Sequence, residues 1–272
     1  MTTITSPALS LLASLNSANS APSLISILYG GGAPSGGDPV AALIQAENNQ
    51  TKSITNQEKD PQTKRDVDRF LAAVAKAPDL KTLLADPTAR KVLLTANGLG
   101  DQVDYTALAT RALSSDTTKT GNLASTLSDT RWLNLAKTYD FANKGLSVLK
   151  TQSVLDTITS GYAEVQWRES LDKTTPGLSA ALDFRSRAST ITNVDQILGD
   201  KNLREVVTTA LGIPKEIAFQ SLNAQEKAIT DRVDITKFKD PKFVEQFTRR
   251  YLVAASTAAS TDGSSPSTGL LV

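Results

Sequence analysis

The feature that most constrains the fold of this chain is an internal repeat. The segment LLADPTARKVLLTANGLG, which begins at Leu83, returns 114 residues later as ILGDKNLREVVTTALGIP. One register pairs the apolar positions of the two copies, and it also pairs Asp86 with Asp200 and Gly98 with Gly212. An aspartate before an amphipathic stripe caps a helix N-terminus, and a glycine after it takes the left-handed turn that ends the helix. The repeat therefore predicts two equivalent capped helices.

The same pattern occurs twice more, at Asp129 and Asp240. In both places an apolar residue lies two positions before the aspartate and an aromatic residue lies three positions after it. The four aspartates are separated by 43, 71 and 40 residues. These intervals indicate two halves of two helical units each, separated by an inserted connection.

Helical spacing of apolar residues continues between the repeats, and no Asn-Gly or Asp-Gly hairpin joins alternating runs. We therefore predict an all-α fold with an internal duplication over residues 61–255. In the connection we expect Gly161 to interrupt one helix and a second helix to begin near Thr175, with Pro176 in its first turn. The sequence leaves open whether the two halves pack on each other or exchange helices between protomers.

The two ends differ in composition from this middle region. Between Met1 and Pro39 the only ionisable side chain is Asp38. We expect residues 1–60 to form a disordered segment that contains a linker and a candidate export signal, and residues 256–272 to form a disordered tail. The first segment lacks the basic region of a secretory signal peptide, and no apolar run approaches the roughly 20 residues that a membrane span needs.

The charge and composition of the chain exclude several function classes. Histidine and cysteine are absent, which removes imidazole bases, thiolate nucleophiles and most zinc sites. The chain has 29 basic and 28 acidic side chains, a formal net charge of +1, so no overall field favours nucleic acid. We expect no catalytic residue, no cofactor, no metal and no nucleic-acid partner.

Three groups of residues have a functional interpretation beside a structural one. The four aspartates could form a carboxylate cluster, although helix capping is favoured. Glu164, Arg168 and Glu169 could form a charged site, although a solvated, salt-bridged helix face is favoured. Trp132 and Trp167 are more typical of core than of a ligand platform. A small-molecule site between paired halves is a further alternative, but the sequence shows no polar cluster that would line it.

At the repeated helices the chain resembles a known bacterial family. The segments that carry the resemblance are NLASTLSDTRWLNLAKTYDF, GYAEVQWRESL, LDFRSRASTITNVDQILGDKNLREVVTTALGIP and DITKFKDPKFVEQFTRRYL, and the likeness extends over about Val67 to Val253. Members of this family carry a helical domain of unknown function, are found mainly in alphaproteobacteria, and are commonly encoded in flagellar gene clusters. The resemblance implies a helical, flagellum-associated protein without assigned catalytic residues.

Together, the resemblance and the composition lead to a functional expectation. Flagellar export substrates are addressed by uncharged, Ser/Thr/Asn-rich N-termini, which is the composition found before Asp38. We expect a non-enzymatic, exported flagellar component or assembly accessory that contacts other flagellar proteins. The alternative is a cytoplasmic adaptor, regulator or chaperone of flagellar assembly. The oligomeric state is left open.

Overall fold

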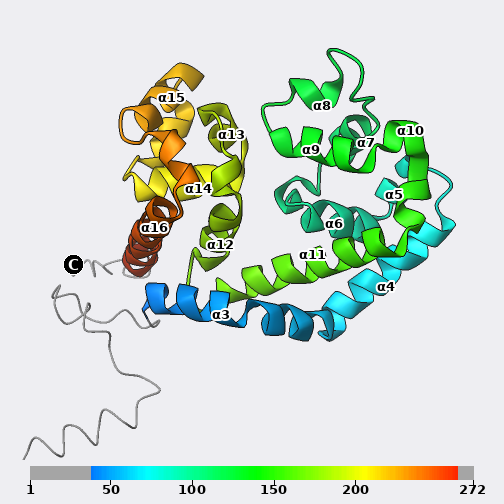
Figure 1. Cartoon of the computed structure of the whole chain (residues 1–272), viewed down its shortest axis with the longest axis horizontal. Coiled ribbons are helices and arrows are strands. Elements are labelled where there is room, and N and C mark those ends of the chain that lie inside the picture. Colours follow the sequence, from blue (N-terminus) through cyan, green and yellow to red (C-terminus); the bar gives the residue numbers. More distant parts are fainter. Residues whose placement is uncertain (1–37, 263–272) are drawn as a thin grey trace, which may run out of the picture.

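The structure, a computed structural model, describes residues 38–262 (Figure 1). This part of the chain consists of helices joined by short turns and contains no β-strand, which confirms the predicted all-α class. The expectations for the export signal before Asp38 and for the last ten residues lie outside the described residues. No helix within residues 38–262 combines the length and apolar character that crossing a membrane requires.

Two helical bodies form the halves of the molecule, and two further long helices, α3 and α11, lie beneath them (Figure 1). Helix α3 spans Pro39–Glu58 and helix α11 spans Gln152–Leu171, each with 20 residues. The first half contains α4 (Pro61–Lys76), α5 (Leu80–Ala85), α6 (Pro87–Ala96), η1 (Gly100–Gln102), α7 (Thr106–Leu113), α8 (Leu123–Thr126), α9 (Thr130–Tyr139), α10 (Phe141–Lys144) and η2 (Gly145–Lys150). The second half contains α12 (Leu178–Arg187), η3 (Ala188–Thr190), α13 (Val194–Gly199), α14 (Lys201–Ala210), η4 (Lys215–Phe219), α15 (Leu222–Thr230), η5 (Ile235–Lys239) and α16 (Pro241–Asp262).

The sequence repeat builds the same helix pair in each half. Asp86 accepts hydrogen bonds from two backbone N–H groups of the first turn of α6, at 2.8 and 3.0 Å. Asp200 does the same for α14, at 2.9 and 3.1 Å. Gly98 and Gly212 follow these helices with φ of +76° and +63°, in the left-handed region that favours glycine. The helix pairs α5–α6 and α13–α14 are therefore equivalent.

Each half has its own apolar core. The first contains Phe70, Leu83, Leu93, Trp132 and Leu149, and the second contains Trp167, Phe184, Val207, Phe238 and Phe247. Both tryptophans thus lie in the core. The aromatic rings of the second core pack closely, with ring centroids 5.2–5.6 Å apart among Phe184, Phe238 and Phe247. Burial of this apolar area is the main source of stability in both halves.

The two halves exchange their long helices. Helix α3 precedes the first half in sequence, yet its buried Leu43 and Ala46 belong to the second core. Helix α11 precedes the second half, yet its buried Ile158 and Tyr162 belong to the first core. The two helices lie side by side and run in opposite directions (Figure 1). Within one chain, α3 therefore packs on the core of the second half, and α11 contributes to both cores, because its Trp167 belongs to the second.

A contact between equivalent positions marks the centre of this exchange. The side-chain amide of Gln50 donates a hydrogen bond of 3.4 Å to the Glu164 carboxylate, and these residues are 114 positions apart, the interval of the sequence repeat. A residue touches its own equivalent only near a twofold axis. The arrangement is therefore that of a swapped dimer whose two protomers are joined in one chain.

Both predicted ends of the helical region are wrong. Residues 1–60 were expected to be disordered, but α3 begins at Pro39, where Asp38 accepts a hydrogen bond from the Val40 N–H at 2.9 Å. The apolar side chains of α3 are too few to predict a core from this segment alone, because they are buried against residues of the second half. Residues 256–272 were expected to form a tail, but α16 continues to Asp262.

The connection between the halves also differs from expectation. Helix α11 continues through Gly161, because that residue lies against the end of α6, where a Cβ would be 3.1 Å from the carbonyl oxygen of Ala96. The following helix begins at Leu178 rather than near Thr175, after Gly177 with a φ of +85°. Gly161 thus allows α11 to lie close to α6, and Gly177 allows the turn before α12 to lie close to Tyr251 of α16.

Candidate functional site

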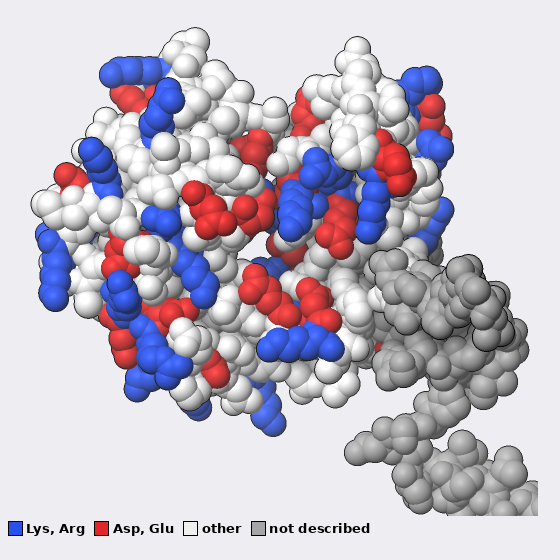
Figure 2. Space-filling view, turned by 180° about the vertical axis from the view of Figure 1, so that it is seen from behind, with Lys and Arg blue, Asp and Glu red and all other residues white. Residues whose placement is uncertain are grey.

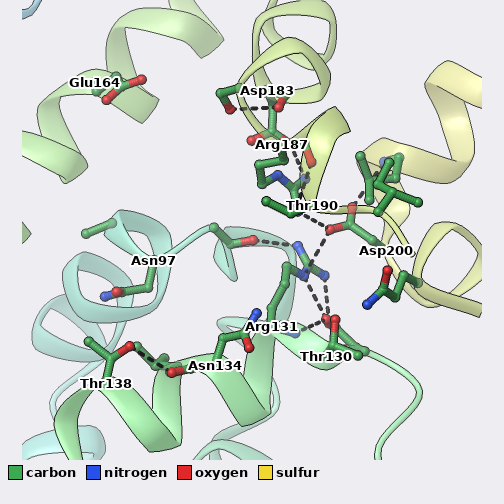
Figure 3. A pocket seen from close by; sticks show the side chains of 18 of the residues that line it. Asn97, Thr130, Arg131, Asn134, Thr138, Glu164, Asp183, Arg187, Thr190 and Asp200 are labelled. Atoms are coloured by element: carbon green, nitrogen blue, oxygen red, sulfur yellow. Dashed lines mark hydrogen bonds and ion pairs between the residues drawn. The ribbon is translucent and has the colours of Figure 1, made fainter. Parts of the chain in front are cut away.

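A cleft of about 690 Å³ lies between the two halves. Its walls come from the end of α6, from α9 and α11, and from α12, α13 and α14. The view from behind shows the surface hollowed between the halves, with acidic and basic side chains on both sides (Figure 2). The close-up shows charged side chains of both halves directed at one another across it (Figure 3).

Arg131 is the residue that joins the two sides of the cleft. It lies in the first turn of α9 and is only 8% exposed. Its guanidinium forms ion pairs with Asp129 at 2.8 Å and Asp101 at 3.0 Å in its own half, and with Asp200 of the other half at 3.2 Å. It also donates a hydrogen bond to the carbonyl oxygen of Gly98. One side chain thus connects two helix caps and the turn that ends α6.

A second set of ion pairs lies on the opposite wall. Arg187 of α12 pairs with Asp200 at 2.6 Å and with Asp183. Arg168 of α11 pairs with Asp183 at 3.2 Å and with Glu164 at 3.8 Å. The buried Nε atoms of Arg168 and Arg187 have no hydrogen-bond partner. Arg168 is therefore a largely buried member of the cleft, whereas Glu169 is exposed. The expected salt bridge on this face of α11 is present, but the expectation of a solvated side chain is wrong for Arg168.

The charges in the cleft hold one another ionised. Burial alone would lower the pKa of Arg131, but the hydrogen bonds to Asp129 and the charge of Asp200 raise it well above its ordinary value. Burial alone would raise the pKa of Asp200, but the hydrogen bond and charge of Arg187, together with the charge of Arg131, lower it. Because Arg131 pairs with Asp129 of its own half and with Asp200 of the other half, the cluster works as an electrostatic clamp between the halves.

Close backbone packing lies next to the clamp. Gly199, the last residue of α13, meets the start of α9, and a Cβ at this position would be 2.8 Å from the carbonyl oxygen of Ser128. Because the nearest atoms are backbone atoms of Ser128 and Asp129, rotation of a side chain could not relieve this clash. The two halves therefore meet through both charge pairing and a glycine contact.

The structure brings two of the four predicted cap residues together. Asp129 accepts the N–H of Arg131 at 3.0 Å as the cap of α9, and through the Arg131 side chain it is joined to Asp200. Asp86 lies elsewhere and pairs with Arg69 at 3.3 Å. Asp240 caps α16 through the N–H of Lys242 at 2.9 Å. No group of three or more acidic side chains within residues 38–262 is arranged to hold a metal ion.

The polar lining of the cleft was not predicted from the sequence. Asp129 and Asp200 were predicted only as caps, without their partners Arg131, Asp183 and Arg187. The expectation that no polar cluster would line a cleft between the halves is wrong. The only local signal is the Asp129-x-Arg131 spacing, which also occurs on ordinary helix surfaces. The partners become visible only when the two halves are placed together.

A second feature is an exposed apolar surface on the second half. Phe219 at the end of η4 is 89% exposed, and Leu222 at the start of α15 is 54% exposed. In the first half Tyr105, which lies 114 positions before Phe219, is 58% exposed. Phe219 and Leu222 are three positions apart in the chain, so one partner segment could contact both.

The fold and the cleft define a class of helical protein built as an internally duplicated pair of swapped halves. The chain belongs to the family described as "Protein of unknown function (DUF1217)", which matches residues 96–244. Among solved structures, it is similar to the X-ray crystal structure of a protein from Agrobacterium tumefaciens, with 22% sequence identity and a TM-score of 0.65. That similarity covers 82% of this chain and 96% of the other, and it shows a shared fold. No curated protein matches the chain.

Proposed function

We propose that this protein is a non-enzymatic component of the flagellum, either an exported structural part or an assembly accessory, that acts by protein–protein contacts. The observation that carries the proposal is the exposed pair Phe219 and Leu222, because leaving two large apolar side chains in water is unfavourable unless a partner covers them. The flagellar assignment rests on the resemblance of the repeated helices to a family commonly encoded in flagellar gene clusters.

The chemistry of the cleft supports a structural role over catalysis. A carboxylate that acts as a general base is free to accept a proton and has a raised pKa. The pKa of Asp200 is lowered instead, and its carboxylate is paired with two arginines. Arg131 is likewise occupied by carboxylates from both halves. The clamp fixes the relative position of the halves, which is what a rigid contact surface requires.

Cell fractionation tests the proposed location. We would compare wild-type cells with an export-deficient strain and blot cytoplasm, medium and purified basal bodies for the protein. We expect the protein in the medium or the organelle of wild-type cells, and we expect this fraction to be lost in the mutant strain. Retention in the cytoplasm of both strains would contradict export and make the protein a cytoplasmic adaptor of assembly.

A deletion of residues 2–37 separates the address from the folded part. Because the described helices begin at Pro39, the protein that lacks residues 2–37 should keep its helical circular dichroism spectrum. We expect it to disappear from the medium and the organelle. If the deleted protein is still exported, the N-terminal segment is not the signal.

A further inference from the structure

The position of α3 raises a question about how the chain behaves beside other copies of itself. Within residues 38–262, α11 is joined to the folded body at both ends, by η2 before it and by α12 after it. Helix α3 is separated from α4 by the two residues Lys59 and Asp60. A change in the backbone at this turn moves α3 away from the second half, and the first core stays intact because it contains none of the buried residues of α3.

Helix α3 is also loosely seated on the second half. Its buried residues are Pro39, Leu43 and Ala46, out of 20 in the helix. A groove of about 490 Å³ runs between it and the end of α11, lined on the far side by Trp167, Leu171 and Leu178. A second cavity, of about 230 Å³, lies between α3 and α12. Both hollows are open at the surface, so grooves flank α3 on two sides and few of its side chains are fully buried.

The partly buried Ala42 and Ile54 of α3 also pack on the second core, and its polar contacts lie at the rim of this interface. Glu47 pairs with Arg185 of α12 at 2.9 Å, and Gln50 reaches Glu164 over 3.4 Å. Side chains at such partly exposed positions exchange their partners for water at little cost. The Leu43 side chain, 1% exposed, supplies most of the apolar attachment.

We propose that α3 is an exchangeable element that docks in the second half of another copy of this chain. The docking site is the one that α3 fills in its own chain, so the contacts of Leu43 and the Glu47–Arg185 pair form unchanged between copies. Exchange of an identical element is a low-cost route to a dimer, and a short hinge such as Lys59–Asp60 favours it. This inference does not depend on the proposed function.

Mass action sets the concentration at which exchange occurs. The two-residue tether holds α3 near its own second half at an effective concentration of about 1 mM, the order expected for a short linker. Copies of the chain at similar concentrations compete with the intramolecular contact. A monomer in dilute solution and a reciprocal dimer in concentrated or co-refolded samples are the expected states.

The chain contains no cysteine, which permits a direct test. The variants Gln50→Cys and Glu164→Cys each carry one thiol, and those positions are in contact only across the α3–α11 interface. We would mix the two variants, unfold and refold them together at about 0.5 mM, oxidise them, and measure the disulfide-linked dimer on a non-reducing gel. We expect at least fivefold more linked dimer from the mixture than from either variant alone.

The matched control uses a contact inside the first half. Arg69→Cys and Asp86→Cys replace residues whose side chains are 3.3 Å apart, and α3 exchange does not separate them. Their mixture should give only the background of random collisions. Equal yields from the two mixtures would overturn the proposal.

A second measurement does not depend on the single variants folding well. Light scattering on the size-separated wild-type protein, refolded at about 0.5 mM, should show a species of twice the chain mass. The double variant Gln50→Cys/Glu164→Cys, folded at low concentration and oxidised, should stay monomeric, and reduction followed by refolding should restore the dimer. A wild-type protein that remains monomeric throughout would refute exchange.

Discussion

Replacing Arg131 with alanine should remove the connection between the halves, and its cost can be worked out from the structure. Arg131 is 8% exposed and pairs with Asp101, Asp129 and Asp200. Removing one partner of a buried ion pair leaves uncompensated charge and typically costs about 3–5 kcal/mol. Because Asp200 keeps its 2.6 Å contact with Arg187, we expect the lower end, about 3 kcal/mol.

Equilibrium urea unfolding, followed by circular dichroism, measures this loss. For a protein of this size the loss corresponds to a fall in Tm of roughly 6–12 °C. Arg131→Met separates charge from volume: it fills the space but leaves the carboxylates unpaired, so it should lose nearly as much stability as alanine. Combining Arg131→Ala with Asp200→Asn should cost less than the sum of the two single changes, because the buried charge left behind is removed.

The matched control is Arg249→Ala. Arg249 forms an exposed pair with Glu245 at 2.6 Å on one face of α16, where a helical ion pair contributes about 0.3–0.5 kcal/mol. If the free energy of unfolding of Arg131→Ala falls by no more than that of this control, the charge cluster does not hold the halves together and the interpretation of the cleft is refuted.

Two further predictions concern the same interface. Gly199→Ala places a Cβ 2.8 Å from the Ser128 carbonyl oxygen and should lower the free energy of unfolding by about 1–3 kcal/mol, the usual cost of overpacking. The control Gly100→Ala places its Cβ 3.3 Å from a side-chain oxygen and should cost less. Equal losses of stability in urea unfolding would contradict the close approach of Gly199 to the backbone. Acid should weaken the clamp, because the pKa of Asp200 is lowered in the folded state: its contribution to stability is present above the unfolded pKa of about 3.9 and is lost as the pH falls through the folded value. Asp200→Asn should therefore flatten the pH dependence of the unfolding free energy below about pH 4, and an unchanged acid limb would rule out this contribution.

Much of the helical framework can be predicted from the sequence because its signals are local. Asp86 and Asp200 lie directly before the helices that they cap, and Gly98 and Gly212 lie directly after them. Because both pairs recur at one interval, the duplication can be read without any knowledge of tertiary contacts. Such signals depend only on neighbouring backbone groups.

The features that were missed depend on residues far apart in the chain. Helix α3 is polar apart from a few side chains, and it is stabilised by a core built more than 100 residues later. Arg131 reaches Asp200, and no spacing in the sequence indicates that contact. Gly161 suggests a helix break, yet it permits α11 to lie close to Ala96. Tertiary packing decides each of these cases, and it overrides the local preference.

The measurement that tests the proposed function most directly is co-sedimentation with purified basal bodies. We would compare the wild-type protein with the double variant Phe219→Ser/Leu222→Ser, and use Val253→Ser, which changes a 53% exposed apolar residue on α16, as the control. We expect wild type and control to sediment with the organelle and the double variant to be depleted at least tenfold. Absence of the wild-type protein from basal bodies would contradict a role as a structural part of the basal body, and equal sedimentation of the double variant would contradict contact through Phe219 and Leu222.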